Sequence, residues 1–235
     1  MTSLQTLVFY ATPEHDCSYL DDRLATTLFV DPKARINSDL YSRLTHLGFR
    51  RSGSHYYRPR CNHCNACVSV RVLTEHFKPT RSQKRTWLRN QDLIATAVPV
   101  AFYPEHYALY ERYINERHQD GDMYPPSRDQ FQNFLLDARP ETRLIEFRLP
   151  DDTLVGVSVT DRLIDGLSAI YTFFNPDYDS RSLGVFAVLH QIEQCKVLGL
   201  PYLYLGYWIR GCRKMSYKTN YRPMEILLRD RWLVI

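Results

Sequence analysis

Apolar and polar positions divide the chain into two regions that differ in periodicity. Up to about residue 90 the apolar residues fall in short pieces. Only residues 24–32 and 67–73 alternate and carry enough β-branched residues to predict strands. From about residue 91 onward, long segments with helix or strand periodicity follow one another. We therefore predict two domains, a smaller irregular one over residues 1–90 and a larger regular one over residues 91–235.

One short helix is predicted in the first region, in the segment NSDLYSRLTHLG. Asn37 or Ser38 would cap its N-terminus, and Gly48 would end it. Its apolar face, at helical spacing, comprises Leu40, Leu44 and Leu47. Because this region has little other apolar mass, we expect a metal clip or docking onto the second region to stabilise it.

The second region predicts a mixed order of strands and helices. The predicted strands cover residues 92–102, 142–149, 153–161, 166–174, 202–209 and 224–232. The predicted helices cover residues 105–118, 127–137, 182–199 and 212–220. The fold class that we expect is therefore α/β (α+β).

This order of elements is similar to that of a GNAT acyltransferase, so we expect a GNAT acyltransferase-like C-terminal domain behind a smaller, irregular, Cys-containing N-terminal domain. That fold splays two central strands and holds an acyl donor in the gap, below the N-terminus of the next helix. Here the helix begins in the segment SRSLG. Its free N–H groups, the helix dipole and Arg181 predict an anion site.

Charge is distributed unevenly along the chain. The formal net charge is +4. Residues 43–89 contain eleven basic residues and one acidic residue, a local charge of +10 that leaves −6 for the rest. Phe49, Tyr56, Tyr57, Phe77 and Trp87 are interleaved with these charges. Basic residues mixed with aromatic ones favour a phosphate backbone with exposed bases, although a solvated surface is the alternative.

Nothing in the sequence indicates a membrane protein or an exported one. There is no apolar run of about 18 residues, so no transmembrane helix is predicted. The first residues show no basic segment and no small-residue cleavage site. We expect a cytoplasmic protein, and in a reducing compartment grouped cysteines indicate metal ligands or redox thiols rather than disulfides.

Four cysteines stand out by their spacing: Cys17, and the run Cys61, Cys64 and Cys67. Three thiols at three-residue intervals with one remote thiol resemble an iron–sulfur arrangement more than a zinc ribbon, which has two separated pairs. An iron–sulfur cluster or zinc here would be structural or redox-regulatory. Reduced structural thiols without a metal are the alternative.

Long motifs in both regions resemble the aminoacyl-tRNA–protein transferases. They are HDCSYLDDRLATTLFVDP, GFRRSG, YRPRCNHCNACVSVRV and FKPTRSQKR in the first region, then RHQDGDM, NPDYDSRSLGVFAVLHQIEQC and YLYLGYWIRGCRKMSYKTNYRPMEIL. The resemblance covers nearly the whole chain. The family usually has Pro where this chain has Ser18, and Ser-Pro or Cys-Pro where it has Cys212-Arg213.

The resemblance implies an enzyme that adds an amino acid to a protein's N-terminus and so marks the protein for degradation. The compact length is similar to the bacterial branch, which uses Leu-tRNA and proteins beginning with Asp or Glu. In this reaction an α-amine, with a reference pKa of about 7.7 to 8.0, attacks the aminoacyl ester. Passing from ester to amide is downhill, so no ATP or cofactor is required. Positioning should dominate catalysis.

Four residues are candidates for the chemistry. Tyr207 would line the gap, with ordinary strand packing as the alternative. Tyr217 would donate to the oxyanion, and Asp122 would receive the α-ammonium, with a turn aspartate as the alternative. Lys218 would hold a terminal phosphate or the acceptor carboxylate. The predicted tRNA-binding residues are Arg181, Arg210, Lys214, Arg81, Lys84 and Arg85. Because an acidic acceptor needs a cationic partner, Arg50, Arg51 and Arg71 are the candidates that bind its carboxylate, with a solvated surface arginine as the alternative for each.

Other functions stay open at this point. The donor would be Arg-tRNA in place of Leu-tRNA if the chain followed the eukaryotic branch. A GNAT enzyme that uses acyl-CoA would need a second glycine in the segment RSLGVF, and the charge of residues 43–89 would be unexplained. A non-enzymatic RNA-binding protein or iron–sulfur sensor would not need the complete second region.

Overall fold

The computed structural model describes residues 4–137 and 139–235, and its largest element is a mixed sheet. Within those residues this sheet has eight strands in the order β14-β13-β7-β12-β11-β10-β9-β8. Strands β11 and β12 run parallel and all other neighbours are antiparallel. The strands are β7 (Cys67–Leu73), β8 (Ile94–Val98), β9 (Thr142–Arg148), β10 (Leu154–Arg162), β11 (Gly166–Phe174), β12 (Tyr202–Ile209), β13 (Met224–Leu228) and β14 (Arg231–Val234). The predicted mixed α/β class is confirmed.

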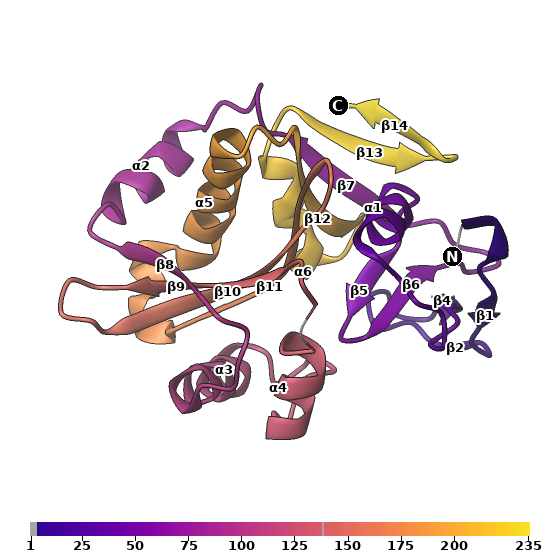
Figure 1. The fold of residues 1–235 in the computed structure, drawn as a ribbon, viewed down its shortest axis with the longest axis horizontal. Coiled ribbons are helices and arrows are strands. Elements are labelled where there is room, and N and C mark those ends of the chain that lie inside the picture. Colours follow the sequence, from indigo (N-terminus) through magenta and orange to yellow (C-terminus); the bar gives the residue numbers. More distant parts are fainter. Residues whose placement is uncertain (1–3, 138) are drawn as a thin grey trace.

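Helices cover both faces of this sheet (Figure 1). Helices α2 (Arg81–Arg89) and α5 (Leu183–Val197) lie on one face. Helices α3 (Pro104–Arg117) and α4 (Arg128–Leu135) lie on the other. Two apolar clusters hold them there, one around α5 and one in which α3 and α4 pack on β9, β10 and β11. No helix in the described part of the chain is long and apolar enough to cross a membrane.

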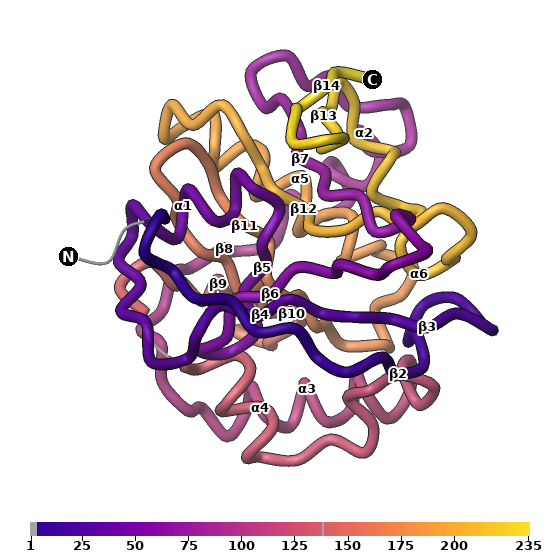
Figure 2. Tube along the Cα trace, turned by 90° about the vertical axis from the view of Figure 1, so that its right-hand side faces the viewer, coloured from indigo at the N-terminus to yellow at the C-terminus, as the bar shows by residue number. Residues whose placement is uncertain are grey.

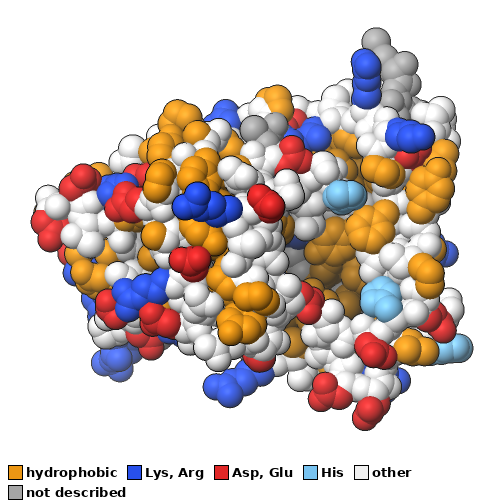
Figure 3. Space-filling view, turned by 90° about the horizontal axis from the view of Figure 1, so that it is seen from below, with side chains coloured by type: hydrophobic (Ala, Val, Ile, Leu, Met, Phe, Trp, Pro, Cys, Tyr) orange, Lys and Arg blue, Asp and Glu red, His pale blue; other side chains and the backbone are white. Residues whose placement is uncertain are grey.

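A second, four-stranded sheet packs on the larger one, on the same side as α3 and α4 (Figure 1). Its order is β1-β4-β6-β5, and Figure 2 shows it in front of β10, β11 and β12. Helix α1 (Ser38–His46) packs with it, capped by Asn37 as predicted. The strands are β1 (Phe9–Ala11), β4 (Thr27–Val30), β5 (Arg50–Ser52) and β6 (His55–Pro59), beside a small pair of β2 (His15–Asp16) and β3 (Leu24–Ala25). Figure 3 views the molecule from below and shows a hollow in its surface that is lined by hydrophobic side chains.

The boundary that we place at residue 90 does not separate the two sheets, because one strand of the larger sheet comes from the first region. Strand β7, from the first region, lies between β12 and β13 of the larger sheet. Its backbone pairs with both neighbours, for example Ser69 with Tyr207 and Val70 with Ile226. The first region therefore gains its missing core by contributing a central strand to the second.

Several predicted elements differ in detail. The predicted strand over residues 224–232 is a hairpin, because Arg229 and Asp230 have positive φ angles of 48° and 59° and turn the chain back. The predicted helix over residues 212–220 is a short α6 (Arg213–Ser216) followed by a 3₁₀ turn, η3 (Tyr217–Asn220). Strands β1, β5 and β6 and helix α2 were not predicted.

Strands β11 and β12 separate after a short stretch of pairing. They pair only from Gly166 with Tyr202 to Ser168 with Tyr204, although β11 continues to Phe174 and β12 to Ile209. The remaining halves of the two strands diverge and leave a gap in the middle of the sheet.

Candidate functional site

Arg50 of β5 reaches from the smaller sheet into the gap between β11 and β12. Its guanidinium donates to Ser168 Oγ at 2.9 Å and to the backbone oxygen of Ala169 at 2.6 Å. Ser168 is the last residue of β11 that pairs with β12, and Ala169 is the next. The guanidinium therefore lies where the two strands part.

Arg50 is half-buried and, within the described residues, has no carboxylate partner. Its two recorded acceptors, a hydroxyl and a carbonyl, are neutral. A cation that is withdrawn from water without a counter-charge is costly. This arrangement is typical of a site that receives an anion.

Gly206 of β12 makes room for the guanidinium. A β-carbon on Gly206 would lie 3.0 Å from Arg50 Nε, and the residue has a φ of +78° that side chains rarely adopt. Pairing with β7 shifts register between Tyr204 and Gly206. This bulge turns Tyr207 toward the same side as Tyr204, whereas regular alternation would place them on opposite faces.

Lys218 in η3 is a second cation near Arg50. Only 6% of it is exposed, and its Nζ donates to the backbone oxygen of Tyr207 at 2.6 Å. Burial, and then the nearby charge of Arg50, lower the pKa of Lys218 to about 7. We refer to Arg50 and Lys218 as the cation pair. Lys218 itself has no acidic partner in the part of the chain that the structure describes.

Tyr217 lies beside the cation pair. The residue is 45% exposed, and Lys218 Nζ lies 5.8 Å from the centroid of its ring. Burial raises the pKa of Tyr217, and the charge of Arg50 opposes this. Tyr217 also helps burial to raise the pKa of Tyr113 in α3, to about 12. The hydroxyl of Tyr217 therefore stays protonated near neutral pH and can donate a hydrogen bond.

The hydroxyl of Tyr207 is used by the scaffold. It donates to the backbone oxygen of Gly48 at 2.8 Å and lies 3.2 Å from that of Tyr57. Burial raises the pKa of Tyr207 well above its usual value. Our assignment of Tyr207 to the chemistry is therefore corrected: the side chain ties β12 to the N-terminal region, and only its backbone oxygen contacts Lys218.

Two of the three arginines expected at the acceptor site already have carboxylate partners. Arg51 is fully buried and forms a two-pronged ion pair with Asp161, at 2.6 and 2.9 Å. Arg71 donates to Glu225 at 2.6 Å and lies over the ring of Tyr202. Their charges are compensated within the fold, so we withdraw both from the acceptor site and keep Arg50.

The segment that follows α3 approaches the site from another side. Burial raises the pKa of Tyr19 well above its usual value, and nearby Tyr57, Cys67 and Asp122 add to this. Asp122 is exposed and lies within electrostatic range of Tyr19. Lys214 of α6, expected to bind tRNA, forms an ion pair with Asp120 at 2.8 Å that holds this segment near α6.

The four cysteines singled out by spacing do come together. Cys17, Cys61, Cys64 and Cys67 line one small cavity of about 30 Å³, and all are free thiols. Burial, and then the neighbouring Cys17, Cys61 and Cys64, raise the pKa of Cys67 to about 12. Four thiols suit zinc or an iron–sulfur cluster chemically. As placed, however, no three Cys, His, Asp or Glu side chains among the described residues are positioned to hold one metal ion. We therefore derive no step through a metal.

Comparison with known proteins gives the family. The family described as "Arginine-tRNA-protein transferase, C terminus" matches residues 105–228, and its N-terminal counterpart matches residues 15–85. The chain belongs to the arginine-tRNA-protein transferase family. Within this family it is 66% identical to the "Aspartate/glutamate leucyltransferase" of Hahella chejuensis, across the whole of both chains. It is 58% identical to the protein of the same name from Marinobacter nauticus, across 99% of this chain and 98% of that one.

A solved structure overlaps only distantly with this family member. It is L-PGS from Bacillus licheniformis, at 7% identity and a TM-score of 0.47, over 60% of this chain and 45% of that one. We draw no functional argument from an overlap at this level.

The remaining residues expected to bind tRNA come from three segments of this transferase family member, which are α2, the turn before α5 and the end of β12. Arg181 precedes α5, and its guanidinium is bound to Asp92 by two contacts, at 2.8 and 2.9 Å, so its charge is compensated within the fold. Arg81, Lys84 and Arg85 lie on the exposed side of α2, and Arg210 is exposed after β12. Arg181 also donates to the backbone oxygen of Arg89 at the end of α2, so it lies beside that helix. The assignment of these residues to tRNA stays a prediction.

Sequence reasoning overlooked residues of the site that carry no charge. Ser168 and Gly206 shape the position of Arg50, whose charge opposes the burial that raises the pKa of Tyr57. Gly206 had an available signal, because an isolated glycine inside a strand often marks a bulge or a close approach. Ser168 had no such signal, and Tyr57 stood out only as one of the aromatic residues between the basic ones.

Proposed function

We propose that the protein transfers leucine from Leu-tRNA to the α-amine of proteins that begin with Asp or Glu, which creates a degradation signal. The observation that carries this proposal is the cation pair, a withdrawn guanidinium and a buried amine without an acidic partner among the described residues. The names of the relatives support the same substrates. Arg50 and Lys218 would supply the counter-charges that an acidic N-terminal side chain requires.

The separated strands offer a location for the aminoacyl ester, as the GNAT-like fold would require. The acceptor's carboxylate on the cation pair would fix its α-amine beside the ester carbonyl. A nitrogen–carbon bond then forms and the carbon–oxygen bond to the ribose breaks, while the ribose oxygen leaves with a proton. Because both reactants are held in place, their translational entropy is lost on binding and not in the chemical step.

Two further side chains have roles that match their environment. Tyr217, whose hydroxyl stays protonated, would donate to the oxyanion that develops on the ester carbonyl. Asp122, within electrostatic range of Tyr19, would receive the α-ammonium and orient it before it loses its proton. Neither role needs a covalent intermediate, and the transfer needs no cofactor. A donor of charged tRNA also implies a cytoplasmic protein.

Transfer of radiolabelled leucine, and separately arginine, from charged tRNA to peptides tests this function. The peptides would begin with Asp, Glu, Asn or Ala and be otherwise identical. We expect leucine on the Asp and Glu peptides alone. Arginine transfer would overturn the donor, and transfer to the Asn peptide at the same rate would overturn the role of the cation pair.

A further inference from the structure

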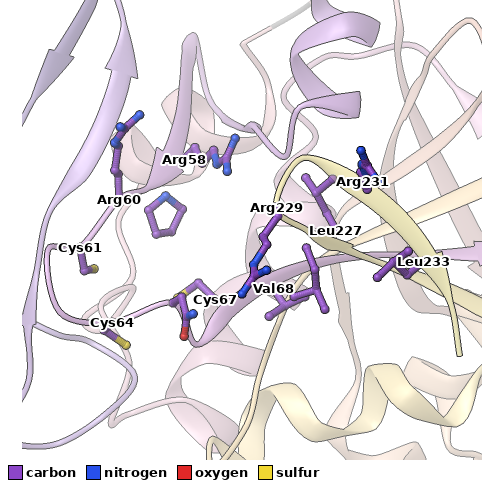
Figure 4. Close-up of a pocket in the computed structure, with 13 residues that line it drawn as sticks. Arg58, Arg60, Cys61, Cys64, Cys67, Val68, Leu227, Arg229, Arg231 and Leu233 are labelled. Atoms are coloured by element: carbon purple, nitrogen blue, oxygen red, sulfur yellow. The ribbon is translucent and has the colours of Figure 1, made fainter.

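Four arginines surround an open groove of about 1020 Å³ beside the cysteine run (Figure 4). Arg58 and Arg60 come from the end of β6, and Arg229 and Arg231 from the β13–β14 hairpin opposite. Its other lining residues are Pro59, Cys61, Cys64, Asn65, Cys67, Val68, Leu227, Leu228 and Leu233. The groove thus has cationic rims and an apolar floor, and none of its lining residues is acidic.

The arginines of this groove are largely uncompensated, in contrast to Arg51 and Arg71. Arg60, Arg229 and Arg231 are exposed, and no ion pair engages them within residues 4–137 and 139–235. Arg58 reaches Asp230 only at 3.5 Å, and its stronger contact is to the backbone oxygen of Leu47 at 2.7 Å. The groove therefore presents positive charge to solvent.

The hairpin that carries two of these arginines is fixed in place. Strand β13 pairs with β7, Ile226 opposite Val70, and Trp232 of β14 donates to the backbone oxygen of His46 at 3.0 Å. The tight turn at Arg229 and Asp230 directs Arg229 toward Val68 and Cys67 (Figure 4). The positive rim is thus part of the folded scaffold.

The groove adjoins the functional site through the cysteine run. Pro59, Cys61, Cys64, Asn65 and Cys67 line both the groove and the small cysteine cavity. That cavity is also lined by Tyr19 and by Ile209, the last residue of β12. Cys67 and Val68 of the groove pair with Ile209 and Trp208 of β12, next to Tyr207, whose backbone oxygen contacts Lys218. The groove and the cation pair therefore lie on neighbouring residues of β7 and β12.

We propose that this four-arginine groove binds the phosphates of the donor tRNA next to the end that carries the amino acid. Guanidinium groups bind phosphates through paired hydrogen bonds, and four of them along one groove match a chain of regular negative charge. The acidic acceptor already has a counter-charge at the cation pair, which leaves the groove to the other anionic substrate. This inference rests on the proposed function.

The test removes the two hairpin charges with R229N/R231Q, because Asn tolerates the positive φ at position 229. R35Q/R162Q is the matched control, since both residues are exposed arginines outside the groove. We expect R229N/R231Q to raise the KM for Leu-tRNA roughly tenfold and to leave kcat unchanged at saturation. The dependence of uncharged-tRNA affinity on salt should lose about 1.5 in log–log slope, since each phosphate contact contributes roughly 0.7 to 0.9.

The outcomes separate the groove from the proposed function. Transfer by the wild type with an unchanged KM for Leu-tRNA in R229N/R231Q would overturn the groove alone. A raised KM for the acidic peptide, with an unchanged KM for Leu-tRNA, would assign the groove to the acceptor. That result would also overturn the proposal that the groove binds tRNA. Absence of transfer by the wild type would overturn the function, whereas tRNA affinity would still report on the groove.

Discussion

Arg50 and Arg51 are neighbours in one strand and point to opposite sides of it. Arg51 is fully buried against Asp161, which holds it by two contacts and also accepts from Tyr41 and Thr142. Among the described residues, the hydrogen-bond acceptors of Arg50 are a serine hydroxyl and a backbone carbonyl. The difference teaches that a buried arginine whose charge is compensated serves the fold, whereas one left uncompensated at a strand gap is available to a ligand.

The largest effect should come from Arg51, and it should be on stability. Arg51→Met leaves Asp161 buried without its counter-charge, so we expect the free energy of unfolding to fall by about 3–5 kcal/mol. Arg50→Met, one residue away, should change it by about 1 kcal/mol or less. Urea unfolding of both variants measures this. Equal losses in the two variants would contradict the distinction.

The pH dependence of acceptor binding should follow from Lys218. The pKa of Lys218 is about 7 in the free protein, so its amine is mostly neutral above pH 7. Binding of a carboxylate there is then coupled to the uptake of one proton by Lys218. We expect the KM for an Asp peptide to rise by up to about tenfold per pH unit above pH 7. In Lys218→Met that rise should vanish. A wild-type KM that is flat from pH 6.5 to 9 would show that Lys218 does not face the carboxylate.

Stability offers an independent check on the same group. The pKa of Lys218 is lowered on folding, from 10.5 to about 7, so the unfolded chain binds more protons between these values. Stability of the wild type should therefore rise with pH across that window. Lys218→Met should be more stable than the wild type below pH 7, and this advantage should shrink as the pH approaches 10.5.

Gly206 allows a smaller change to the position of Arg50. Gly206→Ala would bring a β-carbon to 3.0 Å from Arg50 Nε, so we expect transfer to Asp peptides to fall about tenfold, with a stability loss of about 1–2 kcal/mol. Gly199→Ala is the matched control, because its φ is +65° but no atom lies within 4 Å. It should lose similar stability and keep full transfer. Equal transfer activity in the two variants would show that Gly206 does not position Arg50 for the reaction.

The smallest effect should come from Tyr207. Tyr207→Phe leaves the carbonyls of Gly48 and Tyr57 without this donor, so we expect a stability loss of about 1 kcal/mol. Transfer should change less than twofold, because the backbone oxygen that contacts Lys218 is retained. Parallel thermal melts and transfer assays would decide. A loss of more than tenfold in transfer would show that the Tyr207 hydroxyl takes part in the reaction.

The fold of the second region could be predicted from sequence because its elements are long. Helix α5 and strands β9 to β12 span enough residues for periodicity to appear. Strands β1, β5 and β6 have three to five residues, too few for a period. Helix α2 buries Gln83 and Thr86 rather than apolar residues, and its visible signal was the capping box of Thr80 and Gln83.

The site could be predicted only in part, for a physical reason. Lys218 and Tyr217 lie in a segment that resembles the family, and the structure places both beside Arg50. The roles of Arg50 and Arg51 could not be distinguished from sequence, because Asp161 lies 110 residues from Arg51. Which arginine has a partner depends on how the two sheets pack, and local pattern does not record that.

The most direct test of the central claim compares two peptides that differ only in the charge of their first residue. We would measure kcat/KM for leucine transfer to an Asp peptide and to its Asn counterpart, with the wild type and with Arg50→Met. The account predicts that Arg50→Met lowers the Asp value by about 10²–10³-fold, as expected for truncating one member of a buried charge pair, and leaves the Asn value unchanged. Equal losses for both peptides, or a preference for Asp that survives in the variant, would contradict it.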